Sequence, residues 1–318
     1  MKLIVIKKKR IYLGLFIISI SLLGFNIHNK LYKQNIIMGG NYSIISCENE
    51  DKEVMRNIDG NNLEKYFRPS NLQILNDKTY DLENLPKDLN KEPRETIINY
   101  YSILREAANP KSNNKTGCGT IGYAKEPYPI AYNFLTSKYQ NQLSYNKYLQ
   151  SFENILHINL IKLEQVQTDE NHKDSLKYFI EIETIEGSDK PIGYFGYYYG
   201  FIYLDKENNT YKISDTQLYG ENYLCTPYHG WKNDAQSLVE IEYGDWCKLI
   251  DGELKVESDG YKKNIYLNGK DGYEYKVEFI TLTNGDDIKI ADFKKIDGKW
   301  TYININPEKC LDKNNNKK

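Results

Sequence analysis

The sequence predicts an α+β protein: an N-terminal transmembrane helix, then helices packed on a curved antiparallel sheet, and last a smaller domain made of a helix and an antiparallel β-meander. Three observations predict this order. A basic cluster precedes an uncharged apolar run at the N-terminus, and apolar residues keep helical spacing between residues 93 and 155. From about residue 157 onward, alternating patterns and hairpin dipeptides dominate.

The first 28 residues indicate a basic segment followed by a membrane anchor. Residues 7–10 (Lys-Lys-Lys-Arg) precede residues 11–27, an uncharged stretch of seventeen residues that would rise roughly 26 Å as a helix. The positive-inside rule keeps the basic cluster in the cytoplasm and places the rest of the chain outside. Because no Ala-x-Ala site follows, an uncleaved single-pass anchor is preferred to a cleaved signal peptide, the alternative that would give a secreted protein.

Composition is that of a globular protein, with 27% charged and 40% hydrophobic residues among 318. The net charge of −2, with both signs interspersed, excludes nucleic acid as a partner because no basic field would attract a polyanion. The abundance of Lys, Asn, Ile and Tyr indicates a low-GC, Gram-positive-type cell.

Residues 29–92 carry polar runs with only short apolar pairs, which predicts a spacer between the anchor and the first domain.

The first domain, residues 93–220, begins with helical patterns. Pro93 suits a first helical turn, and residues 94–108 place Ile97, Tyr101 and Leu104 on one face. Further helices are predicted over residues 128–142 and 145–155 by the same spacing.

Strands follow the helices in this domain. Alternation predicts strands near residues 157–167, 177–186, 194–204 and 210–218. Residues 206–209 (Lys-Glu-Asn-Asn) supply turn chemistry between the last two, which should therefore form a hairpin.

The second domain, residues 221–310, opens with a helix from Trp231 to about Tyr243 and continues with strands. The dipeptides Asn284-Gly285 and Asp297-Gly298 predict two hairpins, since both central residues of such turns need positive φ. An antiparallel meander is the expected result, and residues 311–318 are expected to form a disordered tail.

Three helices followed by four strands over residues 93–218 resemble the cone-like α+β fold of the nuclear transport factor 2 and ketosteroid isomerase superfamily. The resemblance lies in the pattern of elements and includes no signature motif. It implies a setting among cell-wall synthase accessory domains, substrate-binding modules or conjugation-channel scaffolds. The Asp base and Tyr–acid pair of the isomerases have no counterpart that can be aligned here, so the resemblance implies no catalytic residue.

The motifs of known enzymes fail on spacing or on partners. The S-x-x-K and K-T-G matches within residues 112–117 belong to one loop, so they cannot face each other across a cleft. Cys118 lies between two glycines, and none of its candidate bases comes with a family signature. Those bases are His157, His172 and His229.

Metal sites are equally incomplete. Cys225 and His229 supply only half of a zinc site, and the sequence after Asp205 lacks the Gly and the final Glu of a calcium loop. We therefore expect no catalytic residue, no cofactor and no metal.

The helix between Cys225 and Cys247 turns the chain back, so these two cysteines are predicted to form a disulfide.

The Tyr-rich strand of residues 194–203 offers aromatic faces that suit a glycan or a peptide. Tyr194, Tyr198 and Tyr203 are the candidate contact residues, together with Trp231 at the seam between the two domains. The competing interpretation is that half of these rings belong to the core.

The function predicted from these observations is that of a membrane-anchored, extracytoplasmic binding or scaffold protein of the cell envelope, without catalytic activity. Its expected partners are the membrane, through the N-terminal helix, and an envelope protein or glycan. Two alternatives stay open: a small-ligand enzyme using the interior of the cone, and a scaffold subunit of a conjugation or secretion channel. The sequence predicts no oligomeric state.

Overall fold

The structure is a computed structural model, and it describes residues 35–43, 72–75, 78, 80–86, 88–111, 124–168, 172–187, 193–221 and 230–315. The chain divides into two units, Met1–Ile36 and Ile37–Lys318. The described residues belong almost entirely to the second unit.

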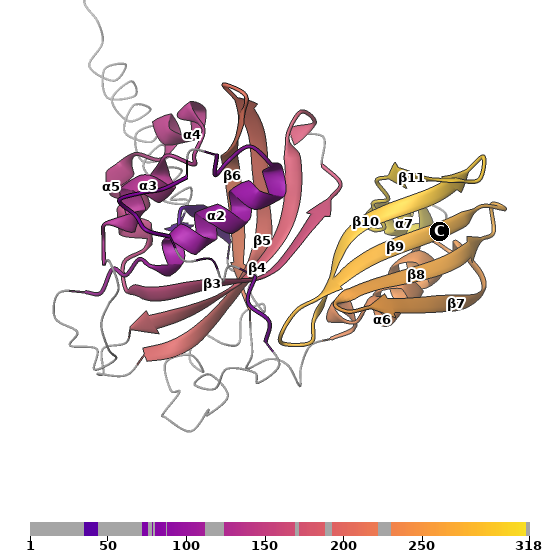
Figure 1. Ribbon diagram of the computed structural model, residues 1–318. Coiled ribbons are helices and arrows are strands. Elements are labelled where there is room, and N and C mark those ends of the chain that lie inside the picture. Colours follow the sequence, from indigo (N-terminus) through magenta and orange to yellow (C-terminus); the bar gives the residue numbers. More distant parts are fainter. Residues whose placement is uncertain are drawn as a thin grey trace, which may run out of the picture. The chain divides into compact units, whose positions relative to one another are not determined.

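The described residues are mostly β-sheet, so the predicted α+β class is wrong. One sheet has six strands in the order β1-β2-β6-β5-β4-β3, and the other has five in the order β11-β10-β9-β8-β7 (Figure 1). The strands of the two sheets are as long as fifteen residues, whereas three of the four helices before β3 have only six or seven. The helices are short compared with the strands, and they do not form a layer as extensive as the sheets.

The predicted membrane anchor is also not supported. Residues 11–27 lie outside the described residues, and no helix in the described part of the chain is long and apolar enough to cross a membrane. The described part of the chain therefore gives no support to a single-pass membrane protein or to its predicted orientation.

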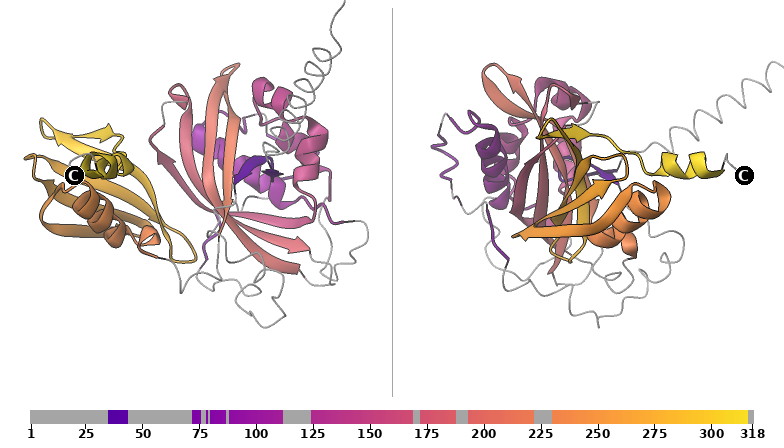
Figure 2. Two further views of the ribbon diagram at one scale, coloured as in Figure 1. Left: turned by 180° about the vertical axis from the view of Figure 1, so that it is seen from behind. Right: turned by 90° about the vertical axis from the view of Figure 1, so that its right-hand side faces the viewer.

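Four helices precede the long strands: α2 (Pro93–Arg105), α3 (Pro127–Tyr132), α4 (Ser137–Gln142) and α5 (Tyr145–Ser151). They lie on one side of the first sheet (Figure 2). α2 starts at Pro93 as predicted, because a proline at the first turn loses no helical hydrogen bond. Its predicted apolar face is confirmed, since Ile97, Tyr101 and Leu104 are buried.

The first sheet is built from β3 (Ile155–Val166), β4 (Leu176–Gly187), β5 (Gly193–Glu207) and β6 (Thr210–Gly220), each antiparallel to the next. The predicted hairpin between β5 and β6 is confirmed. Asn208 and Asn209 form its turn with positive φ, which asparagine tolerates better than most residues.

Two short strands, β1 (Asn35–Ile37) and β2 (Gly40–Ser43), lie within the segment that the sequence predicts to be a spacer. β2 pairs in parallel with β6, and the Asn41 side-chain amide donates to the Asp215 carboxylate at 3.1 Å. This pairing joins residues 174 positions apart in the sequence, so no local pattern could predict it.

The second sheet contains β7 (Ile250–Asp259), β8 (Lys262–Gly269), β9 (Glu274–Thr281), β10 (Asp287–Ile296) and β11 (Lys299–Ile303). Both predicted hairpins are confirmed, with positive φ at Gly285, Asp297 and Gly298. The helical segment before β7 consists of η5 (Trp231–Asn233), α6 (Ala235–Val239) and the π-helical turn η6 (Glu240–Trp246).

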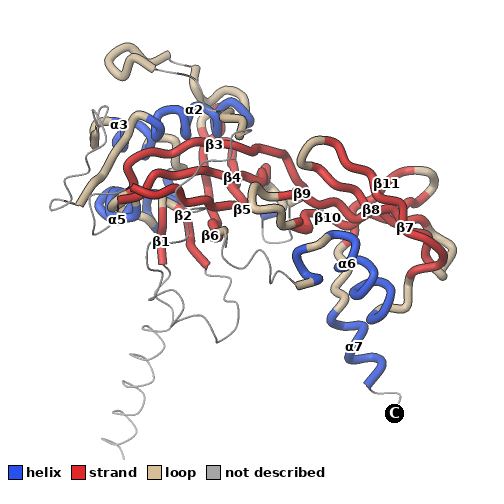
Figure 3. The backbone as a smooth tube through the Cα atoms, turned by 90° about the horizontal axis from the view of Figure 1, so that it is seen from below, coloured by secondary structure: helices blue, strands red, loops and turns tan. Residues whose placement is uncertain are grey.

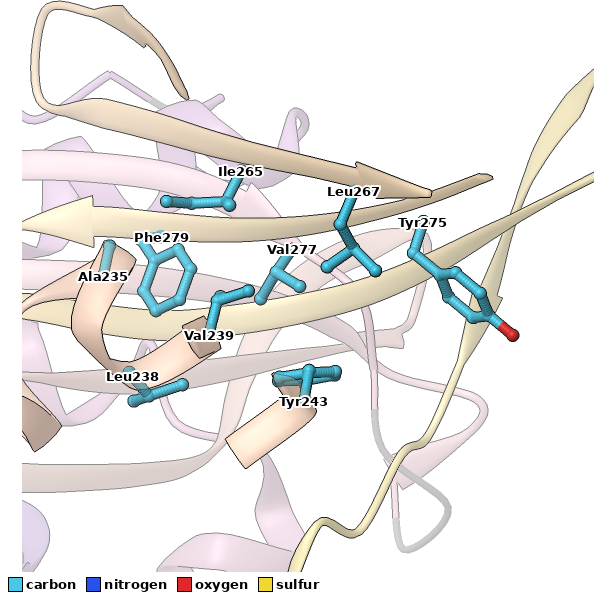
Figure 4. Packing of buried hydrophobic residues seen from close by; sticks show 9 residues of the cluster. All are labelled: Ala235, Leu238, Val239, Tyr243, Ile265, Leu267, Tyr275, Val277 and Phe279. Carbon is cyan, nitrogen blue, oxygen red and sulfur yellow. The ribbon is translucent and has the colours of Figure 1, made fainter. Parts of the chain in front are cut away.

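One face of this sheet forms the core of the second part of the chain. Nine buried residues from α6, η6, β8 and β9 pack together there (Figure 4). α6 and the C-terminal helix α7 (Glu308–Asn315) lie on the same side of the sheet (Figure 3). The opposite side of β7–β11 carries no helix among the described elements.

Candidate ligand-binding face

Two of the predicted contact residues, Tyr194 and Tyr198, meet at one carboxylate. They project from the same face of β5, and their hydroxyls donate to Glu186 at 3.1 and 2.6 Å. Thr184 donates to the same carboxylate at 2.9 Å. The three donors use both oxygens of Glu186 and hold the two rings against the sheet.

Burial raises the pKa of the Tyr198 hydroxyl, and the Glu186 charge raises it further, so the hydroxyl stays protonated and serves as a donor. Gly196, which lies between the two tyrosines, leaves the necessary room. A Cβ at this position would lie 2.5 Å from Glu186 Oε1 and 2.7 Å from Thr184 Oγ1. The cluster is thus satisfied internally, which favours a structural role.

Tyr203 is placed differently because its position has the opposite parity along the strand. It is 1% exposed and stacks on His172, with ring centroids 3.9 Å apart. The structure therefore does not bring the three predicted tyrosines together on one open face.

Trp231 lies in η5, where it packs edge-to-face on Trp246 with centroids 5.5 Å apart. It also contacts the core beneath the second sheet.

Cys247 forms a disulfide with Cys310, 63 positions later. Because a sulfur forms one disulfide, this bond replaces the predicted Cys225–Cys247 pairing; Cys225 itself lies outside the described residues.

The solvent side of β7–β11 provides a different surface, which we call the open face. Its central row crosses all five strands in register and consists of Lys255, Tyr266, Lys276, Phe293 and Tyr302. Residues directly opposite one another across antiparallel strands lie within contact distance on one face. Cationic and aromatic side chains are thus neighbours along the row.

A second row carries Asn268, Glu274, Lys295 and Trp300. Trp300 lies beside Tyr266 of the central row, with ring centroids 5.9 Å apart and ring planes at 51°. The ammonium groups of Lys276 and Lys295 stand 5.5 and 5.7 Å from the Trp300 ring. Cation–π attraction holds these side chains next to one another.

The open face is hollowed beside these rings. A cavity of about 410 Å³ is lined by residues of both rows, among them Lys255, Tyr266, Asn268, Glu274 and Trp300, and also by Glu253 and Glu257 of β7. Its volume falls within the range of about 300–1,000 Å³ typical of small-molecule sites. Of the rings, Tyr266 and Trp300 are half-buried, so each keeps part of its surface available to solvent.

Ion pairs surround the cavity. Lys255 pairs with Glu257 at 2.6 Å, Lys295 with Glu274 at 2.9 Å, and Lys276 with Glu278 at 2.5 Å. Hydrogen bonds from Lys255 and Tyr266 lower the pKa of Glu257, which keeps that carboxylate ionised at neutral pH. The cavity lining therefore presents one ammonium donor, of Lys255, and three carboxylate acceptors, of Glu253, Glu257 and Glu274, next to two flat rings.

One end of the open face packs against residues of the first sheet. Ile280 belongs to a buried cluster with Phe179 and Tyr199 of the first sheet, and Ile288 packs against that cluster. The rows described above lie away from these two isoleucines along the strands, so the cavity is separate from this contact.

Sequence reasoning predicted the meander that carries these residues but not the face. The sequence feature that could have revealed the open face is the Asp297-Gly298 turn. The register set by this turn pairs Lys295 with Trp300 and Phe293 with Tyr302. The partners on β7 could not be predicted, because its pairing with β8 shifts between Asp251 and Lys255.

Comparison with family models, with curated proteins and with solved structures finds no significant match to this chain. The resemblance to the nuclear transport factor 2 superfamily and the Gram-positive setting therefore have no support from known proteins. Among the described residues, no group of three or more His, Cys, Asp or Glu side chains is placed to hold a metal ion.

Proposed function

We propose that this chain is a non-catalytic binding protein whose contact surface is the open face of β7–β11. The observation that carries the proposal is the 410 Å³ cavity lined by Tyr266 and Trp300, two side chains of the open face. Aromatic rings next to a cavity supply contact area with few rotatable bonds, which favours binding because little side-chain freedom is lost.

The alternative is that the rows only stabilise the sheet. Cross-strand aromatic and charged pairs contribute roughly 0.2–1 kcal/mol each, and that explains why lysines and rings alternate. Cross-strand pairing accounts for these pairs but does not call for a hollow beside the two half-buried rings of Tyr266 and Trp300.

The proposal is tested with an array that carries immobilised glycans and an array that carries a hexapeptide library. The full chain should bind a subset of spots, and Trp300→Ala should lose at least tenfold in signal on those spots, because the ring forms a wall of the cavity. Tyr273→Ala is the matched control: it removes a 45%-exposed aromatic ring from the tip of the β8–β9 connection, outside the cavity.

Trp300→Phe keeps a ring at the wall and should retain part of the signal, which guards against a folding defect in the alanine variant. Circular dichroism of each variant checks the fold. Binding that survives Trp300→Ala in a folded chain would reject the open face as the contact surface.

A further inference from the structure

The shape of the cavity wall restricts what it can hold. Tyr266 and Trp300 present two ring planes inclined at 51°, so a planar ligand can stack on one ring but not on both. A saturated ring with an apolar face of C–H bonds fits such a wedge. Its C–H groups meet the electron-rich face of one aromatic ring, and its edge meets the other ring.

The charges restrict the ligand further. Three ion pairs, Lys255–Glu257, Lys295–Glu274 and Lys276–Glu278, balance one another around the rings. Glu253 adds a single negative charge at the rim. A polyanion would meet these carboxylates, while a cation would compete with the lysines that already stand 4.4 to 5.8 Å from the rings of Phe293, Trp300 and Tyr266. With Glu253 included, the net charge of this set is −1, so a cation meets only a weak attractive field and an anion meets none.

The hydrogen-bonding groups match hydroxyls. The carboxylates of Glu253 and Glu274 only accept hydrogen bonds, the ammonium groups only donate them, and the Asn268 side-chain amide does both. A hydroxyl group can donate to a carboxylate and accept from an ammonium group. A ring that carries several hydroxyls can therefore bond to both kinds of group without any charge of its own. The Lys255–Glu257 and Lys295–Glu274 pairs are largely exposed and individually weak, so such hydroxyls can insert between their members.

From these observations we propose that the ligand of the open face is a neutral saccharide, one pyranose ring of which lies in the cavity against Tyr266 and Trp300. This inference rests on the proposed binding function and names its ligand class. It specifies sugar-ring stacking with hydroxyl hydrogen bonds to Asn268 and Glu274.

The test is a calorimetric titration of the full chain with four probes of similar length. Two are neutral, a β-1,4-linked glucose hexamer and an N-acetylglucosamine hexamer; one is anionic, a galacturonate hexamer; one is cationic, a hexalysine peptide. At least one neutral probe should bind, and its dissociation constant should rise at least tenfold in Trp300→Ala and severalfold in Asn268→Ala. Tyr273→Ala should leave the constant unchanged.

The dependence of binding on salt concentration distinguishes a neutral ligand from a charged one. Binding of a neutral saccharide should change less than about twofold between about 50 and about 500 mM NaCl, because no net charge is screened, whereas a charged ligand would weaken markedly. If only a charged probe or a peptide spot binds, and does so in a Trp300-dependent manner, the saccharide inference is overturned while the binding function stands. If no probe or array spot depends on Trp300, both are overturned.

Discussion

Glu181 and Glu221 place two carboxyl groups in the protein interior beside one lysine. Glu181 is fully buried and accepts from Lys162 Nζ at 2.5 Å. Burial raises the pKa of Glu221 well above its ordinary value, and the Glu181 charge raises it further, while Lys162 opposes both effects. One lysine cannot neutralise two buried carboxylates, so protonation of Glu221 is favoured in the folded state.

We predict that Glu221→Gln stabilises the protein at neutral pH. Because the pKa of Glu221 is higher in the folded than in the unfolded state, its favourable contribution is fully present below the unfolded pKa and is lost as pH rises through the folded pKa. Glutamine mimics the protonated acid, so the variant should gain about 1–3 kcal/mol at pH 8. The gain should shrink towards pH 4.

Urea unfolding of both proteins at several pH values measures this difference. Glu164→Gln is a suitable control, since Glu164 belongs to β3, the strand that carries Lys162, and its partly exposed carboxylate pairs with Lys262. A gain for Glu221→Gln that does not vary with pH would show that the carboxyl group is not the cause.

The Cys247–Cys310 disulfide joins the end of η6 to α7. The bond closes a loop of 63 positions that includes all five strands of the second sheet. Cross-linking so long a loop restricts the unfolded chain, an effect worth roughly 4 kcal/mol in the chain-entropy model.

The double variant Cys247→Ser, Cys310→Ser should therefore lose about 2–5 kcal/mol of unfolding free energy. Thermal and urea unfolding measure the loss, and dithiothreitol treatment of the wild type should reproduce it while leaving the double variant unaffected. A change below about 0.5 kcal/mol would mean that the loop is already restricted in the unfolded state.

Elements with local signals were predictable, and elements with distant partners were not. Pro93 located the start of α2, and Asn284-Gly285 located the turn between β9 and β10. The residues of β2 resemble a polar linker because the partner strand β6 lies far along the chain. The helix predicted from Trp231 to about Tyr243 is found, but as three short segments of different helical type.

The predicted α+β class is wrong because helical spacing does not reveal how short each helix is. Helical spacing over residues 128–155 yields three helices of only six or seven residues each, separated by turns. The strands that follow reach fifteen residues and pair along nearly their whole length. Strand pairing is non-local, so its extent is not visible in any sequence window.

The candidate contact residues predicted from the sequence differ from those of the open face for a related reason. The density of tyrosines in β5 predicts a contact face at Tyr194 and Tyr198, but the hydroxyls of both donate to Glu186. The open face gathers its aromatic residues from three strands, β8, β10 and β11, each of which contributes only one or two. Only the register brings Tyr266 and Trp300 together.

The open face and its ligand can be tested by one spectrum, because the chain has three tryptophans. In a ¹H–¹⁵N correlation spectrum of the full chain, each tryptophan gives one indole N–H signal, and Trp300→Phe identifies its own. On addition of the neutral hexasaccharide that binds in calorimetry, the Trp300 signal should shift while those of Trp231 and Trp246, packed beneath the sheet, stay in place. A shift confined to Trp231 or Trp246, or no shift at saturating saccharide, would contradict binding at the open face.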